Sequence, residues 1–147
     1  LYAKPDQDFA STAATVPSQG YVWFALKDPT VLPQTLFWME NHGRHQAPWN
    51  GRNLCIGSED TCGLFAEGLD ASINENPLSK AGIATARTFT PQEPLSVNYI
   101  QGIARVPQGF GRVATITRTE DEITLVSTDK QEVTVGCKVG FLKTGKL

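Results

Sequence analysis

The sequence predicts a mainly β protein, built as an antiparallel β-sandwich. Short apolar and aromatic runs of strand length alternate with clusters of Pro, Gly, Asn and Asp, which is typical of strands joined by turns. No segment shows a helical period of useful length, and the strand spacing favours a sandwich over a small closed barrel. Strict alternation near the end of the chain predicts one strand with a buried face. The residues expected on that face are Val133, Val135, Val139 and Phe141.

The size of the chain predicts one domain. Its 147 residues, 40% of them hydrophobic, can bury one sizeable core. Residues 1–20 are rich in Ala, Ser, Thr, Pro and Gln without sustained periodicity, so we interpret them as an N-terminal arm or loop. We expect residues 21–147 to form a single β-sandwich domain. Because the chain begins at Leu1 and not at Met, we expect a processed product or a fragment.

The first predicted strands lie where aromatic and β-branched residues cluster. They are expected at 21–26, 36–39 and 54–57, because Pro, Asn and Gly punctuate the chain around these runs. Residues 63–70 can form one or two helical turns. The Asn-Glu-Asn-Pro sequence at 74–77 then predicts a loop.

The second half of the chain is more regular. Predicted strands at 82–89 and 95–101 flank a turn that contains two prolines. From Arg112 onward we expect a three-stranded meander, with turns at 119–121 and 128–130. The class is therefore mainly antiparallel β with only short helical turns.

The charge of the chain excludes two classes of partner. A formal net charge of -2, from 13 basic and 15 acidic residues, gives no electrostatic attraction to a phosphate backbone or an anionic membrane surface. No apolar run approaches the ~18 to 20 residues that a spanning helix needs, and no secretory leader pattern opens the chain. We therefore expect neither a nucleic-acid partner nor a membrane partner.

The cysteines indicate a reducing compartment. Cys55, Cys62 and Cys137 are odd in number and contain no Cys-x-x-Cys pair, which fits neither a disulfide framework nor a zinc site. We expect reduced, partly buried thiols. The expected location is cytoplasmic.

Polar and aromatic side chains crowd into residues 38–60, which also contain both histidines. Aromatic rings beside a few fixed polar groups suit a polyhydroxylated ligand, because the apolar faces of a sugar pack on rings while its hydroxyls need donors and acceptors. The alternative is a core tryptophan and a solvated loop whose arginines pair with its own carboxylates. Loops on rigid β scaffolds preferentially carry function, which favours the binding site. The predicted sugar-binding residues are Trp38, His42, Arg44, Trp49, Asn50 and Arg52.

Three segments resemble a known family. Residues 41–52, Asn-His-Gly-Arg-His-Gln-Ala-Pro-Trp-Asn-Gly-Arg, followed by Ile-Gly-Ser-Glu-Asp at 56–60, resemble the signature of a branch of galactose mutarotase-like proteins. Residues 70–74 resemble the Asp-Ala-x-Asn stretch of aldose-1-epimerases, and 90–95 resemble the proline-containing turn with which those enzymes end. The resemblance covers roughly residues 23–142. It implies half of a galactose mutarotase-like supersandwich that binds an aldose-like sugar without a cofactor.

The resemblance also implies catalytic roles. Glu59 aligns with the general base of the family, which removes the anomeric proton so that the sugar ring can open and reclose on its other face. A carboxylate suits this role when it is buried beside apolar residues and another negative charge. The general-acid histidine of the family has no counterpart before Tyr21, so we take His45 as the candidate acid, with His42 as the alternative. Here Asp60-Thr61-Cys62 follows the glutamate, whereas ordinary family members have Thr-Gln.

Other functions remain open at this point. His42 and His45 lie near three carboxylates in the sequence, but His-x-x-His in a loop is a weak metal signal, so we expect no metal. A non-catalytic carbohydrate-binding module requires the aromatic residues without a placed acid. An interaction domain requires Trp38 and Trp49 beneath a partner surface. Half of a larger sandwich has free strand edges, so we expect a homo-oligomer.

Overall fold

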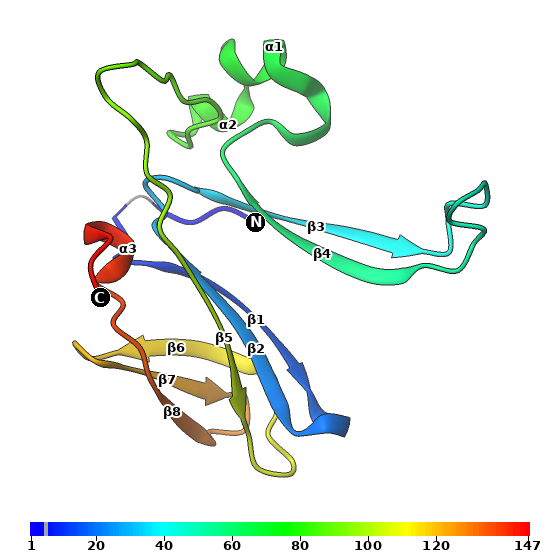
Figure 1. Ribbon diagram of the computed structural model, residues 1–147, viewed down its shortest axis with the longest axis vertical. Coiled ribbons are helices and arrows are strands. Elements are labelled where there is room, and N and C mark those ends of the chain that lie inside the picture. Colours follow the sequence, from blue (N-terminus) through cyan, green and yellow to red (C-terminus); the bar gives the residue numbers. More distant parts are fainter. Residues whose placement is uncertain (5) are drawn as a thin grey trace. The chain divides into compact units, whose positions relative to one another are not determined.

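The computed structural model describes residues 1–4 and 6–147, and these fold into antiparallel β-sheets with a few short helices (Figure 1). The chain divides into two compact units. The first contains residues 1–4 and Leu32–Thr88, and the second contains residues 6–31 and Phe89–Leu147. This division differs from the single sandwich domain expected over 21–147.

The second unit is the predicted antiparallel β-sandwich. One sheet has the order β1-β2-β5 and the other the order β6-β7-β8, with antiparallel pairing throughout (Figure 1). Part of the predicted N-terminal arm is therefore wrong, because residues 10–16 pair with β2 as a strand. The strands are β1 (Ala10–Val16), β2 (Tyr21–Lys27), β5 (Tyr99–Arg105), β6 (Val113–Arg118), β7 (Glu122–Ser127) and β8 (Glu132–Gly136), with η1 (Pro17–Gln19) after β1 and α3 (Phe141–Thr144) near the end.

The two sheets of this unit share one hydrophobic core. Side chains from β2 and β5 meet side chains from β6 and β7, so the apolar faces of both sheets are removed from water. The predicted last strand is too long, because β8 ends at Gly136 and backbone hydrogen bonds then turn the chain into α3. Val133 and Val135 pack against the core and Val139 lies in it, whereas Phe141 begins α3 and is only half-buried. The core residues are Val22, Phe24, Leu26, Ala104, Phe110, Ile116, Ile123, Leu125, Val139 and Leu142.

The first unit is a β-hairpin followed by short helices. The hairpin pairs β3 (Gln34–Asn41) with β4 (Leu54–Thr61), and η2 (Phe65–Glu67), α1 (Gly68–Ile73) and α2 (Pro77–Lys80) follow it. The helical turns predicted for 63–70 are confirmed by η2 and α1.

Two strand predictions near this unit are wrong. Residues 83–89 form no strand, and the next strand begins at Tyr99 rather than at residue 95. Residues 83–89 are held by side-chain hydrogen bonds at Thr85 and not by the backbone hydrogen bonds of a strand pair. The buried Thr85 hydroxyl donates to the Ser72 carbonyl over 2.7 Å and accepts from the Asn76 amide over 2.9 Å. The alternating burial of Ile83 and Thr85 therefore reflects anchoring of a loop.

The contact between Phe24 and Gly102 gives the first test. These residues are directly opposite on β2 and β5, and a Cβ at position 102 would overlap the Phe24 ring. We expect Gly102→Ala to lower the free energy of unfolding by about 1–3 kcal/mol, because the core must deform to admit the methyl group. Urea denaturation measures the change. Gly136→Ala is the matched control, because a Cβ there meets no atom within 4 Å. Equal effects of the two substitutions would contradict this view of the core.

An ion pair between the buried Asp28 and the partly exposed Lys143 in the second unit gives a pH-dependent test. Asp28 lies at the end of β2 and its Oδ1 accepts from Lys143 Nζ over 2.6 Å and from the Thr30 amide over 2.8 Å. Burial acts to raise the pKa of Asp28, but the hydrogen bonds from Lys143 and Thr30 outweigh it and hold this pKa below 3.8. The carboxylate therefore stabilises the fold above the pKa of the unfolded chain, and this contribution is lost as the pH falls through the lower pKa of the folded state.

We expect Asp28→Asn to lower the free energy of unfolding by about 1.5–3 kcal/mol at pH 7, the range for hydrogen bonds to charged groups. The difference between the unaltered protein and this variant should shrink below about pH 4, where the unfolded carboxyl begins to bind a proton. Urea denaturation of both proteins at pH 7, 5 and 3 measures this difference in the free energy of unfolding. A difference that stays constant to pH 3 would show that the charge of Asp28 does not stabilise the fold.

Candidate functional site

The candidate site is built on one face of the β3–β4 hairpin. Trp38 is directly opposite Gly57, Leu36 is opposite Glu59, and the strand period of two places alternate residues on the same side. We call this side the Trp38 face. Its residues are Gln34, Leu36, Trp38, Glu40, Cys55, Gly57, Glu59 and Thr61.

The loop between the strands, residues 42–53, is held by its own backbone. The His42 amide donates to the Asn53 carbonyl over 2.9 Å, and the Gly51 amide donates to the Arg44 carbonyl over 2.8 Å. Asn50 and Gly51 both have left-handed backbone angles, with φ of 51° and 64°. Asn and Gly tolerate this conformation better than other residues, which explains why the chain reverses here. The loop is therefore a defined structure that can position side chains.

A buried carboxylate ties this loop to the Trp38 face. Glu40 is 6% exposed, and its Oε1 accepts from the Arg44 amide over 3.0 Å. Its Oε2 lies 3.6 Å from the Arg44 Nε. A buried carboxylate requires such partners, because its charge loses the solvation of water. Glu40 therefore fixes both the backbone and the side chain of Arg44.

Arg44 in turn brings two tryptophans together. Its guanidinium carbon is 5.0 Å from the ring centroid of Trp38 and 5.4 Å from that of Trp49. Both distances fall within the ~6 Å range of cation–π attraction. The Trp49 side chain stays 40% exposed, and the Arg44 side chain is 51% exposed. Two aromatic rings and a cation thus form one solvent-accessible cluster.

Glu59 lies beside this cluster on β4. A Cβ on Gly57 would be 3.1 Å from Glu59 Oε1 and 3.5 Å from Trp38 Cε3, so the carboxylate and the indole both approach the space that the glycine leaves open. Glu59 is exposed. The structure therefore places the proposed base next to Trp38 but without the burial that the sequence interpretation assumed.

The other four predicted site residues belong to the loop and are exposed. The Nδ1 of His42 is 2.8 Å from the Gly51 carbonyl oxygen, and Arg52 Nη2 donates to the Pro48 carbonyl over 3.3 Å. Asn50 shapes the turn, and the His45 ring lies close to Gly51. The structure thus gathers Trp38, Arg44, Trp49 and Glu59 into one cluster. The remaining predicted residues lie along the loop; they are His42, His45, Asn50 and Arg52. The acid role of His45 stays a prediction.

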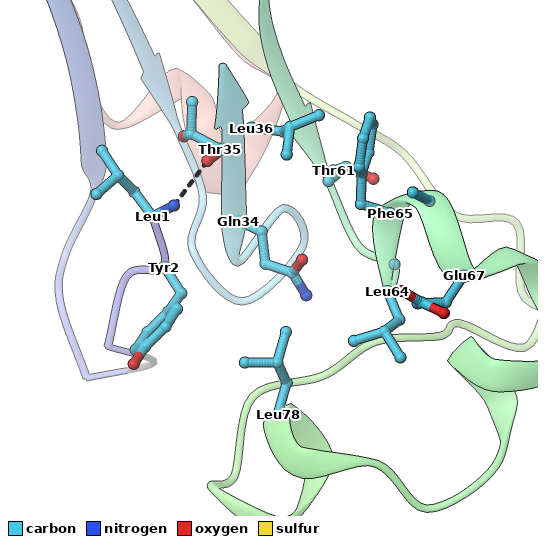
Figure 2. Close-up of a pocket in the computed structure, with 12 residues that line it drawn as sticks. Leu1, Tyr2, Gln34, Thr35, Leu36, Thr61, Leu64, Phe65, Glu67 and Leu78 are labelled. Atoms are coloured by element: carbon cyan, nitrogen blue, oxygen red, sulfur yellow. Dashed lines mark hydrogen bonds between the residues drawn. The ribbon is translucent and has the colours of Figure 1, made fainter. Parts of the chain in front are cut away.

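Sequence reasoning missed the part played by Glu40 and an apolar cavity next to Leu36. The separation of four residues between Glu40 and Arg44 was a usable signal for the ion pair. The cavity has a volume of about 340 Å³ and lies between the hairpin and the short helices (Figure 2). Its lining includes Gln34, Leu36, Thr61, Leu64, Phe65 and Leu78.

Three further properties concern metal binding, membrane-spanning helices and the state of the cysteines. Across residues 1–4 and 6–147, no three His, Cys, Asp or Glu side chains gather closely enough to hold a metal ion. Within the same ranges, every helix is too short or too polar to cross a bilayer. The three cysteines are free thiols; Cys55 is exposed, and burial raises the pKa of the half-buried Cys137.

Comparison of the chain with protein-family models, curated proteins and solved structures finds no match. The resemblance to aldose-1-epimerases is therefore a hypothesis that depends on the sequence motifs alone.

The clamp formed by Glu40 and Arg44 gives a test of the site. We expect Arg44→Ala to lower the free energy of unfolding by about 1–3 kcal/mol, because Glu40 is left buried beside fewer partners. Loss of the cation from both indole faces should also change the near-ultraviolet circular dichroism of the tryptophans. Arg52→Ala, in the same loop, is the matched control and should change both signals far less. Equal effects of the two substitutions would argue against the clamp.

Proposed function

We propose that the Trp38 face and its loop bind a carbohydrate. The observation that carries this proposal is the placement of two indole rings about one arginine, with a carboxylate beside them. Apolar sugar faces pack on indole rings, while guanidinium and carboxylate groups hydrogen-bond to hydroxyls. The exposure of Arg44, Trp49 and Glu59 makes all three chemistries accessible to a ligand.

The ligand class follows from the resemblance described above, which supports an aldose. In that case Glu59 would take the proton from the anomeric hydroxyl, and His45 would protonate the ring oxygen as the ring opens. The exposure of Glu59 favours binding over catalysis as the primary function, because this carboxylate is not shielded from water as the reacting groups of a closed active site are. The homo-oligomer and the cytoplasmic location expected from the sequence stay predictions.

The binding proposal is tested by titrating common aldoses against the protein, with tryptophan fluorescence or NMR shifts as the signal. Trp49→Ala should weaken binding about tenfold, which corresponds to the loss of one aromatic packing contact. Phe37→Ala is the matched control, because Phe37 and Trp49 have the same 40% exposure but Phe37 lies on the opposite face of the hairpin. The proposal is wrong if no aldose binds, or if both substitutions weaken binding alike.

The catalytic role of Glu59 is tested by polarimetry of α/β interconversion. If the protein accelerates this reaction, Glu59→Gln should retain binding and lower the rate by about 10²- to 10⁴-fold, the usual loss of a general base. Asp60→Asn is the matched control, because Asp60 points to the other face, where its Oδ1 accepts from Thr35 over 2.6 Å. Full activity in Glu59→Gln would eliminate this mechanism. An unaltered protein no faster than buffer would leave a binding module.

A further inference from the structure

The apolar cavity continues the Trp38 face along the hairpin. Leu36 lines the cavity, precedes Trp38 by two residues and is directly opposite Glu59. The next pair on the same face, Gln34 and Thr61, also lines it. Since a strand rises about 3.3 Å per residue, Leu36 lies about 7 Å from Trp38 along β3. A ligand of modest length can therefore touch the indole and the cavity at once.

The walls of the cavity are mostly apolar, and hydrogen bonds hold the segments that carry Leu64 and Leu78. Figure 2 shows Leu64 and Leu78 directed toward the same space beside Gln34. The Leu64 amide donates to Ser72 Oγ over 2.8 Å. The Asn76 side chain accepts from the amides of residues 78 and 79, each over 3.0 Å, and so caps the helix that carries Leu78. A ligand would therefore meet Leu64 and Leu78 in positions that hydrogen bonds already hold.

The size and charge of the cavity restrict its occupant. Its volume of about 340 Å³ lies at the lower end of small-molecule sites, which span roughly 300–1,000 Å³. The lining leucines and Phe65 favour an alkyl or aryl group. The lining carries one carboxylate, on the exposed Glu67, and the amino group of Leu1, so neither sign of charge is favoured and the apolar side chains select a neutral group.

We propose that the cavity receives a neutral apolar substituent of the bound sugar, so that the preferred ligand is an alkyl- or aryl-substituted sugar rather than a free one. This inference rests on the proposed carbohydrate site. The sugar ring lies against Trp38 and Glu59, and its substituent passes over Leu36 into the space between Leu64 and Leu78. Burial of each methylene should tighten binding about fourfold, until the cavity is filled.

The experiment is isothermal titration calorimetry with one aldose in two forms, alkyl glycosides and 6-O-acyl esters, each from one to eight carbons and below micelle concentration. The position that shows the chain-length dependence identifies where the substituent is attached. We expect affinity to rise about fourfold per methylene in at least one series and then to level off. The heat-capacity change should become more negative with chain length, as apolar burial requires.

Two substitutions distinguish binding of the alkyl chain in this cavity from its binding to exposed apolar residues elsewhere. Leu78→Asn should flatten the chain-length dependence and leave the methyl derivative within about twofold of its original affinity. Ile56→Asn is the matched control, because Ile56 is 68% exposed on the opposite face of the hairpin. If Leu78→Asn does not fold, NMR contacts between the alkyl protons and the methyl groups of Leu64 and Leu78 in the unaltered protein provide the same test.

Each outcome decides between the two proposals. Equal affinity for short and long chains in both series would overturn the cavity inference and leave the carbohydrate site intact. Octanol bound as tightly as the octyl sugar, with no binding of the methyl derivative, would overturn the carbohydrate site and this inference with it. A chain-length dependence that Ile56→Asn removes and Leu78→Asn does not would place the substituent elsewhere.

Discussion

The buried carboxylate of Glu40 is the constraint on which the candidate site depends. A strand position facing a loop would ordinarily hold an apolar or small residue, because an unpaired buried charge is costly. Here the loop folds back so that Arg44 supplies both its amide and its guanidinium to that charge. The position of Arg44 then determines where two indoles meet. The aromatic cluster is thus a consequence of satisfying one acidic side chain.

The β3–β4 register determines which chemistry each face of the hairpin presents. A shift of one residue would exchange the Trp38 face with the exposed apolar side chains of the opposite face. The hydrogen bond between Thr35 and Asp60, directly opposite each other, holds the observed register at one end of the hairpin. At the other end, the His42 amide is bonded to Asn53. The exposed apolar side chains on the opposite face are Phe37, Met39, Leu54 and Ile56.

The sequence predicted those elements whose pattern reflects burial against a sheet. β2 and the three-stranded meander from β6 to β8 have β-branched and aromatic residues between clear turns, and both were found. Residues 83–89 carry a similar pattern, but Thr85 is buried by side-chain hydrogen bonds that local sequence does not reveal. The division into two units was also missed, because it depends on contacts between segments far apart in the chain.

The sequence predicted where the site lies but not how it is built, because only local patterns can be recognised in a sequence. Crowding of polar and aromatic residues in 38–60 identified the hairpin, since that signal is local. The cavity beside it depends on Leu64 and Leu78, which come from a later loop and from α2 and look like ordinary core residues in sequence.

An open indole surface and an adjoining cavity contribute differently to binding. Contacts at the hydrated indole surface compete with water and so provide orientation more than affinity, whereas apolar burial in the cavity gains free energy with each carbon removed from water. Under the proposed function, selectivity for a sugar and affinity for its substituent therefore reside in two neighbouring parts of one β-hairpin face.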